Sequence, residues 1–409
     1  MSLKSTKEIT ILYYGSSLSI QKGADLCMFR LVKSFNDEKI QTLAILPGHG
    51  GIERKYAREG LKYYIIPSVP LRAKFSLKYQ LSFLMSMIKE IKELRRIIRR
   101  ENVDIIHVND ITFFAGLIAA KLEKRKTVCH VRFISIRYPI VKNVLVYLVT
   151  QLSDAIFCVS KAVQKHLFQS REKWRHASIF VVYDPTPDSI DFSIDDSNKD
   201  FRADLAISKR AFVVCNVSKF TRNKGQLVVA QAAAYLKKAG YNEDDFTFLL
   251  VGGAIENHRN YYETVRAFVS QHQLEKMVRF LGVREDVSWL FSNSDVAVHV
   301  PIHEDPFPGV VLEAMLCGKA VIGSKSGGIP EIIDDGKNGL LIPKNDPEAL
   351  AERLIYLKSH PKVLQQLQQN APDAIRRKFS FNDFKARHLE IYYSLKPELK
   401  PQKETYEIA

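Results

Sequence analysis

The chain has 409 residues, 46% hydrophobic and 26% charged, a globular composition with enough apolar residues for two cores. The net charge of +15 lies in the first half, because residues 1–184 hold 31 Lys and Arg against 15 Asp and Glu, whereas residues 185–409 hold 29 against 30. A polar start, no apolar stretch of membrane-spanning length and five scattered cysteines argue against a secreted, membrane-spanning or disulfide-rich protein, so we expect a cytoplasmic one.

The first half of the chain alternates short β-rich runs with helical patterns. We expect buried strands at Ile9–Tyr14, Ile40–Leu46, Tyr63–Ile66, Asp104–Val108, Thr127–Val131, Ala155–Val159 and Ile179–Tyr183. Helices are expected at Ala24–Asn36, Leu77–Arg100, Phe113–Lys121, Val141–Gln151 and Lys161–Phe168. Strands that alternate with helices predict βαβ units and a parallel sheet.

The expected helix at Leu77–Arg100 is amphipathic. Its apolar residues recur at steps of three or four, at Leu77, Leu81, Leu84, Ile88, Ile91, Leu94 and Ile98. Lysines and arginines fill other positions. Two interpretations stay open: a helix that packs on the core with a solvated basic face, or one that docks on anionic lipid headgroups. The surplus of positive charge in this half favours the second.

The composition then changes, and the alternation starts again. Residues 185–200 contain two prolines, several acids and three serines, which indicates a linker. We expect later strands at Phe212–Cys215, Thr247–Val251, Val278–Leu281, Val296–Val300, Ala320–Gly323 and Leu340–Ile342. Helices are expected at Gly225–Ala239, Asn260–His272, Val310–Leu316 and Pro347–His360, with further helical residues after Pro361. Two Rossmann-like domains, whose open sheets bind ligands outside the carboxyl ends of the strands, predict a cleft that suits two substrates.

The densest group of chemically capable residues follows the strand at Val296–Val300. Two carboxylates, Asp305 and Glu313, are separated by seven residues, with Phe307, Gly309 and Val310 between them. Carboxylates accept bonds from vicinal hydroxyl groups such as those of a sugar or a ribose. The alternative is that Glu313 only complements a helix N-terminus and that Asp305 is a loop acid.

Two more loops follow strands of the second half. Lys219, Arg222 and Lys224 follow the strand at Phe212–Cys215 and precede a helix, an arrangement that suits a diphosphate or is a solvated basic turn. The run Ser-Gly-Gly-Ile-Pro-Glu at 326–331 allows close backbone approach or forms a tight structural turn.

Together these three segments resemble the donor domain of glycosyltransferase family 4, which has the GT-B fold of two Rossmann-like domains with parallel sheets facing a central cleft. The match in order and spacing runs from Arg210 to about Asn370, and looser matches occur at residues 22–25, 104–107 and 154–160. The resemblance implies an acceptor-binding domain at 1–184, a linker at 185–200 and a nucleotide-sugar-binding domain at 201–375. It also implies a C-terminal helix and polar tail at 376–409 that crosses back to the first domain.

The resemblance further implies roles for single residues. Glu313 would hold the ribose, and Asp305, or Glu304 beside it, would contact hydroxyl groups of the donor sugar. Lys219 and Lys224 would bind the diphosphate and stabilise the departing charge. Four residues would line the substrates, namely Gly23 of the first domain and Phe307, Gly309 and Val310 of the second. His130, also in the first domain, would be a catalytic residue that faces the donor sugar and the acceptor, for which a hydrogen-bonded histidine at a strand end is the alternative.

The expected activity is a retaining transfer of a sugar from a nucleotide-sugar to a hydroxyl of a glycan or lipid-linked acceptor, in cell-surface polysaccharide or glycolipid synthesis. No Asp-x-Asp sequence occurs, so we expect neither a metal nor another cofactor. A protein of this kind could attach to the inner face of a membrane.

Other classes of protein match these residues less well. An epimerase or a phosphorylase of the same fold is close, but no segment marks a pyridoxal phosphate site. A nicotinamide-dependent dehydrogenase would need Gly-x-Gly-x-x-Gly after the first strand, where Tyr14-Gly15-Ser16 stands. A basic nucleic-acid-binding protein would need aromatic residues among its cations, and we expect no nucleic acid as partner.

Overall fold

The computed structural model describes residues 9–15, 23–36, 40–68, 77–134, 139–168, 177–186, 200–254 and 258–399. The chain forms two compact units. Unit 1 comprises Met1–Asp184 together with Asn382–Ala409, and unit 2 comprises Pro185–Phe381. Among the described residues, no helix combines the length and the apolar character that crossing a membrane requires.

Unit 1 is built on a seven-stranded sheet in the order β3-β2-β1-β4-β5-β6-β7, and all neighbouring strands pair in parallel. The central strands are buried at every position, which explains why their sequences are apolar throughout instead of alternating. The strands are β1 (Ile9–Tyr14), β2 (Ile40–Leu46), β3 (Tyr63–Ile65), β4 (Ile105–Val108), β5 (Lys126–Val131), β6 (Ala155–Cys158) and β7 (Ser178–Val181).

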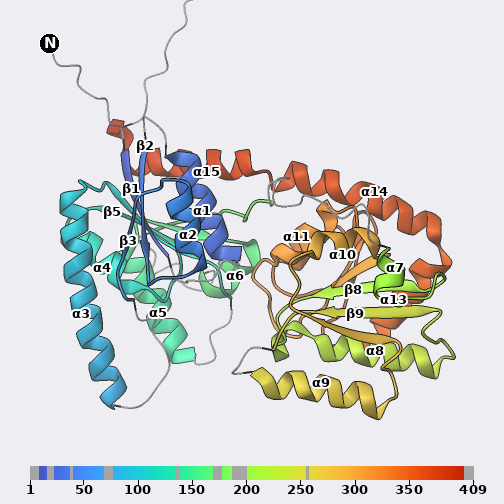
Figure 1. Cartoon of the computed structure of the whole chain (residues 1–409). Coiled ribbons are helices and arrows are strands. Elements are labelled where there is room, and N and C mark those ends of the chain that lie inside the picture. The colour runs from blue at the N-terminus through green and yellow to red at the C-terminus, as the bar shows by residue number, and fades with distance from the viewer. Residues whose placement is uncertain are drawn as a thin grey trace, which may run out of the picture. The chain divides into compact units, whose positions relative to one another are not determined.

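Helices lie on both sides of this sheet (Figure 1). They are α1 (Gly23–Phe35), α2 (Gly51–Arg58), α3 (Leu77–Arg100), α4 (Phe114–Leu122), α5 (Pro139–Leu152), α6 (Lys161–Phe168) and, from the far end of the chain, α15 (Phe381–Leu395), which the short helix η5 (Pro397–Leu399) follows. Tyr392 of α15 is buried and its hydroxyl lies 3.2 Å from that of Tyr13 in β1. The C-terminal helix is therefore part of the core of unit 1.

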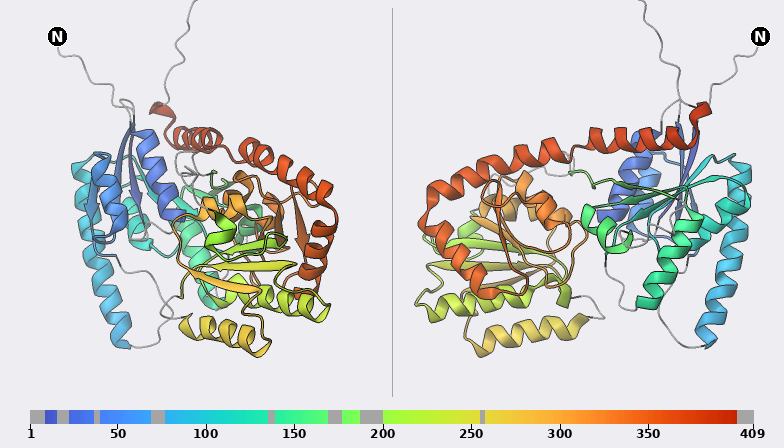
Figure 2. Two further views of the ribbon diagram at one scale, coloured as in Figure 1. Left: turned by 45° about the vertical axis from the view of Figure 1, so that its right-hand side comes forward. Right: turned by 180° about the vertical axis from the view of Figure 1, so that it is seen from behind.

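Helix α3 is divided between core and surface. Its C-terminal part buries Leu94, Ile97 and Ile98, as the amphipathic pattern predicts. Its N-terminal part extends past the strands of the sheet (Figure 2), where Leu81 is 55% and Met85 73% exposed. The apolar stripe thus packs on the core over only half of its length.

Unit 2 is built on a six-stranded sheet in the order β10-β9-β8-β11-β12-β13, again with parallel neighbours. The strands are β8 (Phe212–Val217), β9 (Phe246–Val251), β10 (Val278–Gly282), β11 (Val296–His299), β12 (Val321–Ser324) and β13 (Gly339–Ile342). Its helices are α7 (Phe201–Asp204), η3 (Arg222–Lys224), α8 (Gln226–Lys238), α9 (Arg259–Gln271), α10 (Val287–Asn293), α11 (Gly309–Leu316), α12 (Ile329–Ile332), α13 (Pro347–Ser359) and α14 (Pro361–Lys378).

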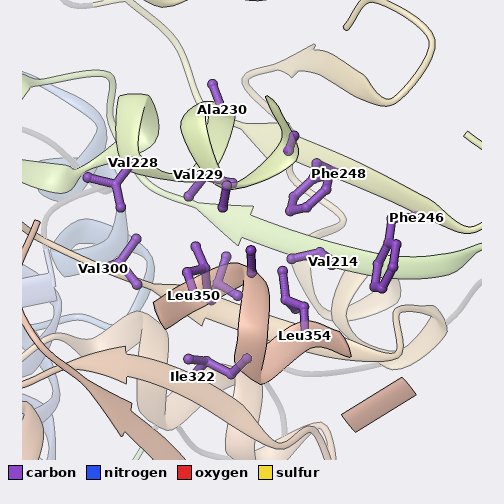
Figure 3. Close-up of a cluster of buried hydrophobic side chains, with 14 of the residues drawn as sticks. Val214, Val228, Val229, Ala230, Phe246, Phe248, Val300, Ile322, Leu350 and Leu354 are labelled. Carbon is purple, nitrogen blue, oxygen red and sulfur yellow. The ribbon is translucent and has the colours of Figure 1, made fainter. Parts of the chain in front are cut away.

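The core of unit 2 fills the space between the sheet and its helices. Figure 3 shows Val229 of α8 and Leu350 and Leu354 of α13 around Val214 of the central strand β8, with Val228 of α8 near Val300. Helix α13 begins as its sequence predicts, because Asp346 accepts a hydrogen bond from the Ala349 amide at 2.9 Å and Pro347 occupies the first turn. This core holds the carboxyl ends of β8, β11 and β12 in fixed positions.

The expected elements agree with the structure within a few residues, but among the described α-helices of seven residues or more, α2 and α10 were not anticipated. Helix α2 follows a Gly-rich stretch that reads as a loop, and Glu53 closes its start by accepting from the Gly50 amide at 3.2 Å. Helix α10 has only seven residues, too few for a helical period to show. Most of the expected linker, residues 187–199, lies outside the described residues.

Candidate active site

Three neighbouring strands of unit 2 end beside one another and carry the motifs. Strands β8, β11 and β12 are adjacent and parallel, so the loops after them leave the same edge of the sheet. The first loop carries Lys219 and Lys224, the second Glu304 and Asp305, and the third the glycines 327 and 328. Lys224 of the first loop contacts Asp305 of the second, about 80 residues away in sequence, and Ser326 of the third donates to the His303 carbonyl oxygen, about 20 residues away. The three loops therefore meet in one place.

A buried carboxylate joins the first two loops. Asp305 is 7% exposed, and its Oδ2 lies 2.5 Å from the ammonium group of Lys224. The same oxygen lies 3.0 Å from Nε2 of His299, the last residue of β11. Lys224, by contrast, is half-buried. Asp305 thus holds a cation at the edge of the sheet.

The electrostatics of this group follow from burial and from the ion pair. Burial alone would raise the pKa of Asp305, but the hydrogen bond from His299 and the positive charge of Lys224 together hold this pKa well below its usual range. Burial lowers the pKa of His299, although its bond to Asp305 opposes this effect. At neutral pH the group therefore consists of a carboxylate, an ammonium ion and a neutral imidazole.

Close backbone contacts fix the loops that carry these groups. Gly225 has a φ of +76°, and a Cβ there would stand 1.9 Å from the Val300 carbonyl oxygen. Gly327 has a φ of +51°, and a Cβ there would stand 1.8 Å from the carbonyl oxygen of Asp305, which also accepts from the Gly328 amide at 2.9 Å. Only glycine fits at either position.

Glu304 connects the second loop to its surroundings by different bonds. Its carboxylate accepts from the Gly327 amide and pairs with the ammonium group of Lys344. The side chain of Glu304 is 34% exposed, compared with 7% for Asp305. Of the two neighbouring acids, Glu304 is therefore the one that reaches the surface of unit 2.

The other expected residues of unit 2 lie along or beside α11. Gly309 is the first residue of the helix and is exposed, whereas Val310 and Glu313 are half-buried. Phe307 is buried and packs edge-on against Phe379, with ring centroids 5.2 Å apart. The structure thus gives Phe307 a packing role at the base of α11.

In unit 1, polar residues gather at the same kind of sheet edge. Arg132 follows β5, and its guanidinium donates to Asn109 Oδ1 at 2.7 Å and pairs with Asp184, the last residue before unit 2. Gly23 is the first residue of α1, and Lys22 before it lies outside the described residues. Charged and helix-terminal groups therefore occur at this edge too.

His130 does not face outwards. It is fully buried, and its ring lies near those of His107, Phe157 and His388, with centroids 5.5 to 5.9 Å away. A side chain buried in this way does not contact a substrate, so we correct the expectation for His130 and assign it a structural role in unit 1.

His107, His130 and His388 are close enough together to be considered as metal ligands, since one nitrogen of each lies within 4.8 Å of the others. Their hydrogen bonds determine the tautomers. The Arg132 guanidinium can only donate, so Nδ1 of His130, 3.3 Å away, accepts and the ring proton lies on Nε2. His388 donates from Nδ1 to the Phe384 carbonyl oxygen at 2.8 Å, which leaves a lone pair on Nε2. Nε2 of His130 and Nε2 of His388 are both buried and have no hydrogen-bond partner among the described residues, so these two rings are neighbours without a hydrogen bond between them.

His299 and Lys344 were not identified from the sequence. His299 belongs to an otherwise apolar strand, and the polar residue at its carboxyl end is the only local signal. Lys344 follows β13 at a distance of 40 residues from its partner Glu304, and no motif marks it. The role of Lys344 depends on a contact between loops that are remote in sequence, whereas His299 contacts Asp305 only six residues further along the chain.

Comparison with known protein families accounts for both units. Residues 197–374 match the family model described as glycosyl transferases group 1, and residues 22–183 match the model described as glycosyltransferase family 4. The two matches are separate and together cover most of the chain.

Individual proteins show the same likeness. The chain is 26% identical to N-acetyl-alpha-D-glucosaminyl L-malate synthase of Bacillus anthracis over 74% of this chain and 78% of that protein. It is 25% identical to the N,N'-diacetylbacillosaminyl-diphospho-undecaprenol alpha-1,3-N-acetylgalactosaminyltransferase of Campylobacter jejuni, over 90% and 96%. The crystal structure of HepE from Anabaena with UDP and glucose is similar in fold, with a TM-score of 0.76, 24% identity and coverage of 94% and 100%.

Proposed function

The chain belongs to glycosyltransferase family 4 and has the GT-B fold, and on this basis we propose that it transfers a sugar from a nucleotide-sugar to a hydroxyl group of a glycan or lipid-linked acceptor, with retention at the anomeric carbon. We place the donor in unit 2 and the acceptor on unit 1. One observation carries the proposal: Asp305 fixes the Lys224 cation at the sheet edge from which α11 also starts.

Different parts of the donor would be bound by different groups: lysines would bind its diphosphate, and carboxylates would accept hydrogen bonds from its hydroxyl groups. Lys219 is exposed in the loop after β8, and with Lys224 it would bind the diphosphate. Glu313 of α11 would accept bonds from the two ribose hydroxyl groups. For the hydroxyl groups of the donor sugar we propose Glu304, because its side chain is more exposed than that of Asp305.

The reaction would break one bond and form one at the same carbon. The bond between the anomeric carbon and the diphosphate oxygen breaks, and the nucleoside diphosphate leaves with the electron pair. The acceptor oxygen bonds to the anomeric carbon on the same face, and its proton passes to an oxygen of the departing phosphate. Lys219 and Lys224 would stabilise the charge that develops on this leaving group, so the proposed reaction needs no metal.

Thermal stability with nucleotides tests the donor site. A ligand that binds only the folded chain raises the midpoint of unfolding. We expect a rise with nucleoside diphosphates or their sugars, tested with UDP, GDP and ADP, and no change on addition of EDTA. UDP is the first choice because HepE was solved with it. Glu313→Gln should reduce the rise. No rise with any of the three would contradict the donor site, and a rise abolished by EDTA would contradict the metal-free reaction.

Transfer itself needs a second assay. With the donor identified, release of nucleoside diphosphate should depend on added acceptor, such as a lipid-linked sugar. An epimerase of the same fold would instead change the donor sugar without any acceptor. Product anomers, read from proton coupling constants by NMR, would then distinguish retention from inversion.

We also propose that unit 1 docks on an anionic membrane surface, on the inner face where lipid-linked acceptors lie. Exposed apolar side chains occur on the N-terminal part of α3 and on α5, at Leu81, Leu84, Met85, Ile88, Ile140 and Val144. The same α3 carries Lys89, Lys92 and Arg96. Apolar residues that enter the headgroup layer beside lysines and arginines are typical of peripheral attachment.

Flotation with liposomes tests the docking. The protein should float with vesicles that contain anionic lipid at low salt, and less with neutral vesicles. Leu81→Ser with Met85→Ser should weaken flotation, whereas Val283→Ser, a similar change at an exposed apolar residue of unit 2, should not. Recovery of all protein in the soluble fraction would refute the docking.

A further inference from the structure

A buried histidine connects the sheet of unit 2 to the ion pair of the candidate active site. His299 ends β11, which pairs directly with β8, the strand that precedes the Lys224 loop. Its side chain is 3% exposed and its Nε2 lies 3.0 Å from Asp305 Oδ2. Neither the sequence motifs nor the family likeness assigns a role to this residue.

The direction of this hydrogen bond follows from the charges. The carboxylate of Asp305 can only accept, so the imidazole must carry its proton on Nε2 and donate it. In the neutral ring, Nδ1 then has a lone pair and no proton. This Nδ1 is buried and has no hydrogen-bond partner within the part of the chain that the structure describes. A buried polar atom without a partner is costly, so the ring is held at this position for the bond that Nε2 makes.

The flexible member of the group is the lysine. An ammonium group on a four-carbon stem has three donors and many rotamers, and it occupies one position only where a fixed acceptor holds it. The acceptor here is Asp305 Oδ2. The backbone of Asp305 is fixed as well, because its amide donates to Ser326 Oγ at 3.2 Å and its carbonyl oxygen accepts from the Gly328 amide. The side chain is oriented by His299, which the β-sheet holds rigid.

We propose that His299 is a positioning residue: it orients the Asp305 carboxylate by donating from Nε2, and through that carboxylate it places the Lys224 ammonium for the diphosphate of the donor. The inference rests on the proposed function, since it concerns the same donor site. Asp305 then acts through Lys224, and His299 touches neither donor nor acceptor.

Three substitutions separate this role from simple packing. His299→Gln can place an amide donor near the position of Nε2, whereas His299→Asn, equally polar, reaches only as far as Nδ1. His299→Phe keeps a ring of similar size and removes both nitrogens. We expect the affinity for UDP, measured by calorimetry, to fall about tenfold in the Asn and Phe variants, the effect of one hydrogen bond to a charged group, and to recover in the Gln variant.

The decisive measurement combines these variants with Lys224→Met. If His299 acts through Lys224, His299→Phe should weaken UDP binding in the wild-type chain and have no further effect in the Lys224→Met chain. An unchanged affinity in His299→Phe, the same loss in both backgrounds, or an equal loss in the Gln and Asn variants would overturn the inference and leave the proposed function standing. If the wild-type chain binds none of UDP, GDP and ADP and transfers no sugar, the proposed function fails and takes this inference with it.

Discussion

Replacing Gly327 by Ala should destabilise unit 2 and impair donor binding together. The added Cβ would stand 1.8 Å from the Asp305 carbonyl oxygen, so the two loops must move apart by more than 1 Å, as the distance of an ordinary contact shows. That movement breaks the bond from the Gly328 amide to Asp305 and the bond from the Gly327 amide to Glu304. Each lost hydrogen bond costs about 1 kcal/mol, and the positive φ costs an Ala about 1–2 kcal/mol.

The expected loss is therefore about 3–4 kcal/mol in the free energy of unfolding of unit 2. Gly336 provides a matched control in the same unit, since its φ is +74° and a Cβ there would meet nothing within 4 Å. Gly336→Ala carries only the cost of the backbone conformation, about 1 kcal/mol after the gain from a stiffer unfolded chain.

Urea unfolding measures both variants in a chain with Trp174→Phe, where the fluorescence comes from Trp289, which is buried in unit 2. Calorimetry with UDP measures donor affinity in parallel, and we expect a loss in Gly327→Ala only. If the two variants lose the same stability and both keep the affinity for UDP, the close approach of the loops is not what positions Asp305, and the reasoning fails.

Three more predictions follow from charges in the two units. Lys224→Met should lower the affinity for nucleoside diphosphates by about tenfold or more, because it removes a charged hydrogen-bond donor while keeping a side chain of similar length. Calorimetry should detect no change in the affinity for uridine, which has no phosphate. The pKa of Asp305 is lower in the folded than in the unfolded chain, so its carboxylate stabilises unit 2 above about pH 4 and this contribution is lost on acidification; Asp305→Asn should make the urea midpoint less dependent on pH below that value. Burial lowers the pKa of His388 from 6.5 to about 3, so below pH 6.5 the unfolded chain binds a proton that the folded chain does not, and His388→Phe should make the melting temperature fall less between pH 6.5 and pH 4.

The sequence was sufficient to predict the elements whose signal is local. Strands buried on both faces, such as β4 and β9, appear as apolar runs between turns, and α8 and α13 show clear starts and ends. Helix α3 shows the limit of such reasoning. Its apolar stripe is continuous in sequence, but only the part that lies over the strands is buried, and the length of the sheet beside it is not a local property.

The candidate site was predicted in part for a similar reason. Residue types and spacing indicated Asp305, Lys224 and the two glycines as parts of three separate motifs, and the family resemblance joined these motifs into one site. They did not show that Asp305 is buried and pairs with Lys224, because this pair depends on the ends of β8 and β11 meeting across about 80 residues of sequence. For His130 the family resemblance suggested a substrate contact, whereas α15, more than 250 residues later, covers it with His388.

The position of α15 also determines the order in which the two units can complete their folds during synthesis. Unit 2 is continuous in sequence from Pro185 to Phe381, so all its residues leave the ribosome as one stretch. Unit 1 is not: Tyr392, whose hydroxyl lies 2.6 Å from His107 Nδ1, is made 285 residues after its partner. Synthesis of unit 1 therefore begins first, but its fold can be completed only last. Until α15 is made, the histidines of unit 1 and the surface on which α15 packs are exposed to water or to a chaperone.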